Sequence, residues 1–272
     1  DPYYCEGQPN NYCPDDAVLC DDDADCPGPA PVCHRPGAGR GVCVPCTPSS
    51  ASACDGDTPV CGEDIACRAC RAHGECASAA CLPQGRCAAE AEVAYVAAGG
   101  EAGACTRSAP CRSFALALAT GRPVLKVTGS VAESVLIEGG RIVTILAEAG
   151  ATLTGAGTSA NLLVRGAGTR VAIHGLTIAQ APATELGYGV FVPPGAGTPH
   201  VELSGVELRR NPAGAISVSV GTFALTRSTL ADNLGGGLYI AGSATMFTVT
   251  ENDIVYNGRA RPPTTSALGD EP

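Results

Sequence analysis

Short apolar runs, separated by turns that contain glycine or asparagine, fill the chain from about Val93 to about Asn257. Apolar and polar residues alternate within many of these runs, for example in VELSGVEL, FALTRSTL and FTVTENDI, which start at Val201, Phe223 and Phe247. Alternation with a period of two is typical of β-strands that bury one face. Because no Asn-Gly turn joins two matched strands as a hairpin, the pattern favours parallel strands in a coil.

Three asparagines repeat in step with these runs. Asn211 and Asn233 are 22 residues apart, and Asn233 and Asn257 are 24 residues apart. A spacing of this size indicates a solenoid, in which each turn buries its apolar side chains against the next turn. We therefore expect the asparagines to form a structural ladder of hydrogen bonds at one corner of the coil. The residues expected to point inward are apolar and alternate along the strands: Val171, Ile173, Leu176, Ile178, Val190, Val192, Val201, Leu203, Val206, Leu208, Ile216, Val218, Phe223, Leu225, Leu230, Leu238, Ile240, Phe247, Val249 and Ile254.

The segment from about Val93 to Gly121 predicts a cap for the first turn of the coil. It reads as a short strand, a loop between Cys105 and Cys111, and a helix over RSFALALATG that ends at Gly121, shortly before Pro123. Such a helix would cover strand edges that otherwise invite pairing with other chains. Since only five residues separate Cys105 from Cys111 and no cysteine follows, we expect these two to be paired.

Fourteen of the sixteen cysteines lie between Cys5 and Cys87, in a region rich in proline, glycine, aspartate and serine. This density predicts that Cys5 to Cys87 are paired internally and that the protein is in an oxidising, extracellular or cell-surface environment. A crossed pairing within each module, first with third and second with fourth, would be compact, but the sequence leaves the connectivity open. After Cys5 and Cys13, the cysteines fall into three modules: Cys20, Cys26, Cys33 and Cys43; Cys46, Cys54, Cys61 and Cys67; Cys70, Cys76, Cys81 and Cys87.

Two other chemistries use the same cysteines. The Cys-x-x-Cys pairs Cys43–Cys46 and Cys67–Cys70 match part of a four-thiolate zinc pattern, and Cys-x-x-Cys also occurs in redox enzymes. Regular groups of four in an oxidising compartment favour disulfides over both.

An acidic run is the best candidate for a metal site. Asp21, Asp23 and Asp25 alternate, and three carboxylates on one loop offer the hard oxygens that calcium requires. The run lacks the glycine and terminal glutamate of an EF-hand loop, and aspartate commonly caps turns. Calcium is the one cofactor for which the sequence offers a site.

Charge and composition divide the chain into three parts. Of a net charge of −10, the segment up to Ala88 carries most, with thirteen acidic residues against five basic ones, so we expect no nucleic-acid partner. No apolar run approaches eighteen residues, so we expect no transmembrane segment. The chain starts at Asp1 rather than Met, and we expect a signal segment to have been removed.

The expected domains are a disulfide-rich repeat domain (1–88), a parallel β-helix with its N-terminal cap (89–258) and a polar tail (259–272).

Two stretches resemble known secreted proteins. The run CDDDADCPGPAPVC and its two diverged copies, together with YYCEGQPNNYC, resemble the disulfide-rich repeats on surface proteins of myxobacteria and their relatives. The stretch from YVAAGG through CTRSAPCRSFALALATG to VTILAEAG is similar to secreted right-handed parallel β-helix proteins of the pectate-lyase-like superfamily. This second resemblance implies an all-β, right-handed coil of about six rungs with an N-terminal capping helix. Because that superfamily contains lyases, hydrolases, adhesins and structural proteins, the fold does not fix the function.

Candidate functional residues are sparse in the coil. If the repeats align, Glu207 and Asp253 share a column with Thr229 between them, and no third acid joins them. The strands that follow the asparagine turns leave Phe191 and Tyr239 pointing outward, with Tyr188 nearby, which predicts a shallow platform for stacking sugar rings. A covering loop over residues 181–189 is the structural alternative.

We therefore expect an exported bacterial surface or extracellular protein with a structural or adhesive role, which contacts polysaccharide or assembles with itself. The alternative is a polysaccharide lyase or glycoside hydrolase that acts on acidic glycans. No catalytic residue is assigned, because neither a calcium cluster with a proton abstractor nor a pair of catalytic carboxylates is recognisable. After Asn257, the chain offers no amphipathic helix to close the coil. We expect the polar tail, a neighbouring copy or a continuation of the chain to cover the last rung, and the second of these would make the C-terminal end a surface for self-association.

Overall fold

The computed structural model describes residues 17–35, 40–157, 159–241 and 244–258. The chain divides into two compact units, Asp1–Glu90 and Ala91–Pro272. We call the first unit the head and the second unit the β-helix. The division lies two residues from the boundary expected from the change in cysteine content.

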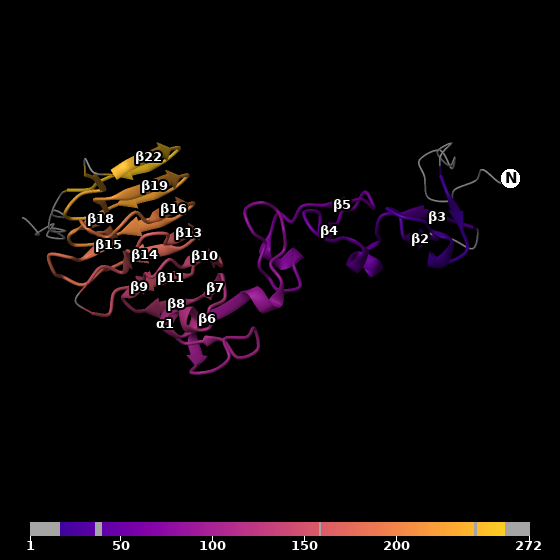
Figure 1. The fold of residues 1–272 in the computed structure, drawn as a ribbon, viewed down its shortest axis with the longest axis horizontal. Helices are drawn as coiled ribbons and strands as arrows, with labels where there is room; N and C mark the ends of the chain where they lie inside the picture. The colour runs from indigo at the N-terminus through magenta and orange to yellow at the C-terminus, as the bar shows by residue number, and fades with distance from the viewer. Residues whose placement is uncertain (1–16, 36–39, 158, 242–243, 259–272) are drawn as a thin grey trace, which may run out of the picture. The chain divides into compact units, whose positions relative to one another are not determined.

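The β-helix consists of three sheets whose parallel strands stack rung upon rung (Figure 1). The first sheet has seven strands: β6 (Val93–Glu101), β7 (Val124–Thr128), β10 (Ile142–Ala147), β13 (Arg170–His174), β16 (His200–Ser204), β19 (Gly221–Thr226) and β22 (Ala244–Thr250). The second has six: β8 (Ser130–Ala132), β11 (Thr152–Thr154), β14 (Thr177–Ala179), β17 (Glu207–Arg209), β20 (Thr229–Ala231) and β23 (Asp253–Val255). The third has five: β9 (Val135–Ile137), β12 (Leu162–Val164), β15 (Tyr188–Val192), β18 (Gly214–Val218) and β21 (Leu238–Ile240).

Consecutive strands visit the three sheets in turn. The chain therefore makes five complete rungs, from β7–β9 to β19–β21, and a sixth that consists of β22 and β23. Each rung is hydrogen-bonded to its neighbours in parallel register, as in the pairing of β16 with β13 and β19. The prediction of an all-β, parallel β-helix of about six rungs is confirmed.

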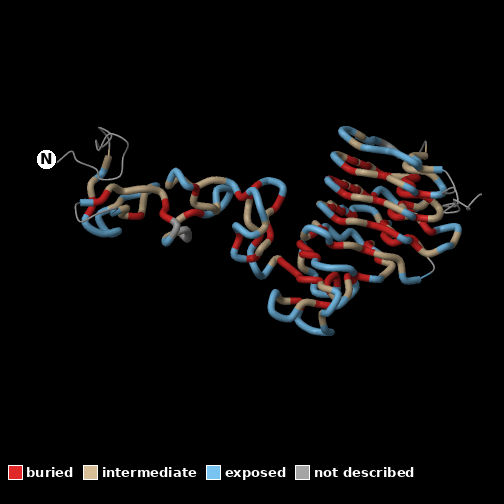
Figure 2. Tube along the Cα trace, turned by 180° about the vertical axis from the view of Figure 1, so that it is seen from behind, coloured by how far each residue is buried: buried red, intermediate tan, exposed pale blue. Residues whose placement is uncertain are grey.

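Equivalent side chains of successive rungs form the core. Val171, Val201, Phe223 and Phe247 hold the same position on four consecutive strands of the first sheet. Strand spacing places such side chains about 4.8 Å apart, and burying each one contributes roughly 1.5 to 3 kcal/mol. All residues predicted to point inward from Val171 to Leu230 are buried, and Figure 2 shows this interior in red. The last rung is different, because its inward residue Phe247 is 58% exposed.

The first rungs are capped by a short helix, α1 (Phe114–Ala119). The Ser113 hydroxyl accepts a hydrogen bond from the Leu116 N–H at 3.2 Å, which gives the helix a side-chain N-cap. The carboxylate of Glu133 accepts from the next two free N–H groups, those of Phe114 and Ala115, at 2.6 and 3.0 Å. The buried side of the helix packs into the core cluster, as the sequence predicts. The helix ends two residues before the expected stop at Gly121, which has a positive φ of 72°.

The head is built from short elements joined by disulfides. Two small antiparallel sheets consist of β1 (Leu19–Cys20), β2 (Val32–His34) and β3 (Gly41–Val44), and of β4 (Val60–Cys61) and β5 (Cys67–Arg68). The described part of the chain before β6 also contains four 3-10 helices: η1 (Asp23–Asp25), η2 (Pro48–Ala53), η3 (His73–Glu75) and η4 (Glu90–Glu92).

The disulfides of the head follow the crossed pairing in all three modules. The first cysteine of each module bonds the third and the second bonds the fourth: Cys20–Cys33, Cys26–Cys43, Cys46–Cys61, Cys54–Cys67, Cys70–Cys81 and Cys76–Cys87. Cys105 bonds Cys111 in the β-helix. No described cysteine is free, whereas Cys5 and Cys13 lie outside the described residues.

Candidate functional site

An aromatic cluster lies on the outer side of the third sheet. The rings of Tyr188 and Phe191, both on β15, are stacked with centroids 5.2 Å apart and an interplanar angle of 21°. Phe191 pairs with Ser217 on β18, which pairs with Tyr239 on β21. Two strand spacings, roughly 9.6 Å, therefore separate the backbones of Phe191 and Tyr239. Tyr239 is 61% exposed, so the loop at 181–189 does not cover it.

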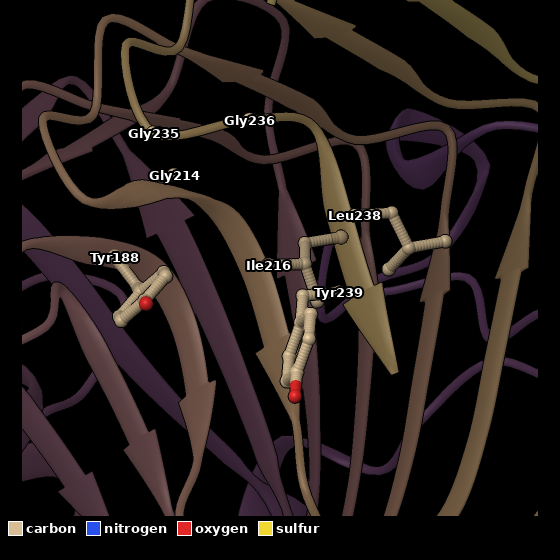
Figure 3. Close-up of a pocket in the computed structure, with 7 residues that line it drawn as sticks. All are labelled: Tyr188, Gly214, Ile216, Gly235, Gly236, Leu238 and Tyr239. Atoms are coloured by element: carbon tan, nitrogen blue, oxygen red, sulfur yellow. The ribbon is translucent and has the colours of Figure 1, made fainter. Parts of the chain in front are cut away.

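A pocket of about 200 Å³ lies beside this cluster (Figure 3). Its walls come from three consecutive strands of the third sheet and from the turn that precedes β21. None of its lining residues is charged. They are Tyr188, Gly214, Ile216, Gly235, Gly236, Leu238 and Tyr239.

Three glycines line the pocket. Gly214 and Gly236 have φ values of 138° and 121°, which side chains rarely adopt. A Cβ at Gly214 would lie 3.2 Å from the Tyr188 ring, and a Cβ at Gly235 would lie 2.0 Å from the Ala213 carbonyl oxygen. Gly214 therefore leaves the Tyr188 ring uncovered, and Gly235 and Gly236 add peptide groups without side chains to the pocket lining. The sequence prediction named the aromatic residues but missed these glycines, although Gly235-Gly236-Gly237 before a strand was a visible signal.

The chemistry of this surface suits a neutral, ring-shaped ligand with hydroxyl groups. Aromatic faces bind the apolar faces of sugar rings, and peptide groups exchange hydrogen bonds with hydroxyls. The volume is below the roughly 300 Å³ at which pockets begin to hold drug-sized ligands. The pocket therefore has room for a single small ring at most.

The two acids predicted to share a column do so. Glu207 pairs with Thr229, which pairs with Asp253, on three consecutive strands of the second sheet. Glu207 forms an ion pair with Arg209, with 3.3 Å between Oε1 and Nε. Its Oε2 accepts a hydrogen bond from the Thr177 hydroxyl, also at 3.3 Å. Its carboxylate is thus part of a surface ion pair, which contributes little to stability.

The histidines of the coil lie on the first sheet. Burial lowers the pKa of His174, the nearby Glu202 carboxylate opposes this shift, and the Arg227 guanidinium adds to it. His174 therefore favours the neutral form at physiological pH. His200 contacts the Thr222 hydroxyl through Nδ1.

The aspartates proposed for calcium have structural partners in the head. Asp25 accepts hydrogen bonds from the N–H groups of Asp21 and Asp22 at 2.7 and 3.3 Å, which lower its pKa. Asp23 accepts from the Cys33 N–H at 2.7 Å and so joins η1 to β2. Within the described residues, the groups of three close potential metal ligands consist of disulfide-bonded cysteines, which cannot act as thiolate ligands. Calcium binding by Asp21, Asp23 and Asp25 stays a prediction.

The asparagine ladder is continuous at the corner between the second and third sheets. Asn211, Asn233 and Asn257 are joined by side-chain hydrogen bonds of 2.9 Å. The sequence prediction missed a fourth member, Asn161, whose Nδ2 lies 3.4 Å from the Asn211 Oδ1. Asn161 precedes β12 instead of following a strand of the second sheet, so the 22- to 24-residue spacing did not indicate it.

Searches of family models, curated proteins and solved structures found no match for this chain. Among the described residues, no helix has the length and apolar character needed to cross a membrane. Support for the stacked parallel sheets and for the disulfide-rich head therefore comes from the structure alone.

Proposed function

We propose that this protein is an exported bacterial surface protein whose β-helix binds polysaccharide and whose role is structural or adhesive. On this proposal it is a non-catalytic member of the pectate-lyase-like superfamily. The disulfides support an oxidising, extracellular environment. The observation that carries the binding role is the uncharged pocket between Tyr188 and Tyr239.

A glycan array followed by titration calorimetry tests the binding role. Removal of a stacking ring costs roughly 0.5 to 1.5 kcal/mol, or up to about tenfold in Kd. We expect Tyr239→Ala to weaken binding of an array-selected oligosaccharide by several-fold and Tyr188→Ala to do the same. Tyr256→Ala is the matched control, since Tyr256 is exposed on the next rung and does not line the pocket. Equal affinities for all variants would place binding elsewhere.

The alternative function is a polysaccharide lyase or glycoside hydrolase, for which Glu207 and Asp253, in one column of the second sheet, are the acids to test. Product analysis after incubation with acidic polysaccharides separates the two functions. Unsaturated or shortened sugars that disappear in Glu207→Gln would overturn the non-catalytic role. Intact polysaccharide together with saturable binding supports it.

A further inference from the structure

The two disulfides of the third head module lie side by side. The sulfur atoms of Cys70, Cys76 and Cys81 are all within 4.8 Å of one another. Cys70 and Cys81 form one of the disulfides, whereas Cys76 belongs to the other, Cys76–Cys87. Because the Cys87 sulfur is bonded to that of Cys76, the crossed pairing gathers all four sulfur atoms of the module at one place.

The other two modules have the same arrangement. Three sulfur atoms, drawn from both disulfides of the module, again lie within 4.8 Å of one another: those of Cys20, Cys26 and Cys43, and those of Cys46, Cys54 and Cys67. Among the described residues, no such group combines cysteines of two modules. The candidate ligand set is therefore the one inside a module, and not the Cys-x-x-Cys pairs, each of which spans two modules.

Four thiolates in this arrangement fit a tetrahedral metal ion. Zinc binds cysteine sulfur at about 2.3 Å in a tetrahedron, which places two of its sulfur ligands roughly 3.8 Å apart. The grouped sulfur atoms of the third module are separated by at most 4.8 Å. Unbonded sulfurs would therefore approach by about 1 Å, and sulfurs released from a disulfide would separate by about 2 Å. Rotation of the cysteine side chains can supply movements of this size.

Main-chain hydrogen bonds position these cysteines without the help of sulfur. Cys81 and Cys87 face each other across a tight turn, which is closed by a bond of 2.9 Å from the Leu82 N–H to the Arg86 carbonyl. The Cys70 N–H donates to another carbonyl of the same turn at 2.8 Å. Three of the four cysteines are therefore anchored to one turn by bonds that do not involve the disulfides.

Charge favours the third module over the second as a thiolate site. Residues 70–87 contain Arg71 and Arg86 and one acid, Glu75, which forms an ion pair with Arg68. Residues 46–67 contain four acids and no lysine or arginine. A divalent ion held by four thiolates is an anionic complex, so nearby arginines stabilise it and nearby carboxylates oppose it. The third module is therefore expected to bind such an ion most tightly.

We propose that the third module is a redox-gated metal site, in which Cys70, Cys76, Cys81 and Cys87 bind a thiophilic divalent cation of the Zn²⁺ type once both disulfides are reduced. A small module with little apolar core needs either disulfides or a metal to hold it together. The disulfides do so in an oxidising environment, and the ion does so in a reducing one. This role does not depend on polysaccharide binding by the β-helix.

The exchange between the two forms uses a dithiol as the reductant. Each disulfide of the module accepts two electrons and two protons from one dithiol, which becomes a disulfide in turn. Two dithiols therefore convert the module to four thiols. Binding of the ion forms four metal–sulfur bonds and releases the four thiol protons to solvent, so the affinity rises with pH.

Titration of the reduced full chain with Co²⁺ tests the site. The chain is reduced with a phosphine, which takes up the oxygen of one water molecule per disulfide, and is desalted under argon. Co²⁺ in a tetrahedral thiolate site absorbs strongly in the visible and near-ultraviolet, and Zn²⁺ removes this absorption by displacing it. We expect both results for the reduced chain and no absorption for the oxidised chain. In hydrogen exchange, Zn²⁺ is expected to restore protection to the Leu82 amide after reduction has removed it.

Two double variants provide the matched pair. Cys76→Ala with Cys87→Ala removes two sulfur ligands from the third module and is expected to weaken the tightest Co²⁺ binding at least about tenfold. Cys54→Ala with Cys67→Ala removes as many from the second module and is expected to leave that binding nearly unchanged. Circular dichroism of the oxidised variants checks that the β-helix is folded.

A third double variant tests the role of charge. Arg71→Gln with Arg86→Gln is expected to weaken the tightest Co²⁺ binding several-fold, and by less at high salt. The proposal is overturned if the reduced chain gives no tetrahedral cobalt spectrum, or if Zn²⁺ leaves the Leu82 amide unprotected. It is also overturned if loss of Cys54 and Cys67 weakens the tightest binding as much as loss of Cys76 and Cys87.

Discussion

Asn211 donates two hydrogen bonds to one oxygen of Asn233, from its backbone N–H at 3.0 Å and from its Nδ2 at 2.9 Å. Both side chains are fully buried. Asn233 in turn donates through Nδ2 to the carbonyl oxygens of Leu208 and Ala231, at 2.9 and 3.0 Å. The ladder therefore satisfies backbone groups that the corner would otherwise bury without partners, and it fixes the register of successive rungs.

The first prediction concerns the stability contributed by this ladder. Asn233→Ala leaves the Asn211 N–H and the Leu208 carbonyl without their partner, and each buried orphan costs roughly 1 to 3 kcal/mol. We expect a loss of about 2 to 5 kcal/mol in the free energy of unfolding, measured by urea denaturation. Asn257→Ala is the control, because Asn257 is only partly buried and solvent can replace its bonds. A loss in Asn257→Ala as large as that in Asn233→Ala would contradict this account.

The second prediction concerns a buried lysine on β7. Lys126 is 2% exposed, and its Nζ forms an ion pair with the Glu148 Oε1 at 2.7 Å. Burial lowers the pKa of Lys126, and the Glu148 carboxylate offsets part of this shift. Between the lowered pKa and the ordinary value of 10.5, the unfolded chain binds more protons than the folded one. Stability is therefore expected to rise with pH through this window.

Lys126→Met tests this linkage. The substitution removes the buried charge, so the rise in stability with alkaline pH is expected to disappear from urea denaturation curves, with stability at neutral pH equal or higher. Glu148→Gln leaves the charge without its partner. Because Glu148 is 42% exposed, we expect a moderate loss of about 1 to 3 kcal/mol. An unchanged pH dependence in Lys126→Met would show that another group is responsible.

The third prediction concerns Glu75 in the third module of the head. Its side chain accepts hydrogen bonds from the Arg68 guanidinium and from the Arg71 N–H, and these lower its pKa from 4.5 to about 2. Since the folded pKa is depressed, the stabilisation is complete above about 4.5 and is lost as the pH falls toward about 2. A carboxyl carbon NMR titration is expected to show the low midpoint, and Arg68→Ala is expected to raise it. A midpoint near 4.5 in the unmodified chain would refute the contact.

The alternating pattern was sufficient to predict the core, because a parallel coil repeats one simple geometry. Val201 and Phe223 were placed inward from their spacing alone, and both are buried. The residues that the sequence did not reveal deviate from that repeat. Asn161 reaches the ladder from a loop, and its Nδ2 bonds to the Ala179 carbonyl at 2.8 Å. Lys126 occupies an outward position in VLKVT, where alternation indicates solvent, yet the structure buries it.

The candidate site was predicted only in part, for a related reason. The outward direction of Phe191 and Tyr239 follows from strand alternation, whereas the pocket depends on turn conformation. Gly214 adopts a positive φ, and a Cβ there would lie 3.2 Å from the Tyr188 ring. The glycine is visible in the sequence, but the ring beside it belongs to another rung. That proximity becomes visible only when the register of β15 with β18 is known.

The last prediction separates the stability of the two units. The disulfides of the head close separations of 11 to 17 residues around little apolar core, and each contributes typically 2 to 4 kcal/mol. The β-helix instead has a continuous core and one disulfide, Cys105–Cys111, whose separation of 6 residues predicts only about 2 kcal/mol. We therefore expect reduction with dithiothreitol to unfold the head and leave the β-helix folded.

Hydrogen exchange followed by mass spectrometry resolves the two units in one sample. After reduction, the amides of β3 are expected to lose protection, because Cys26–Cys43 no longer restrains this strand. The amides of β16 are expected to retain it, since β16 pairs on both sides within the core. The double substitution Cys105→Ala with Cys111→Ala is the control, and it is expected to lower the stability of the β-helix slightly without affecting the head. Loss of protection in β16 upon reduction would instead show that the coil depends on a disulfide, and hence that its stacked aliphatic core is not sufficient for folding.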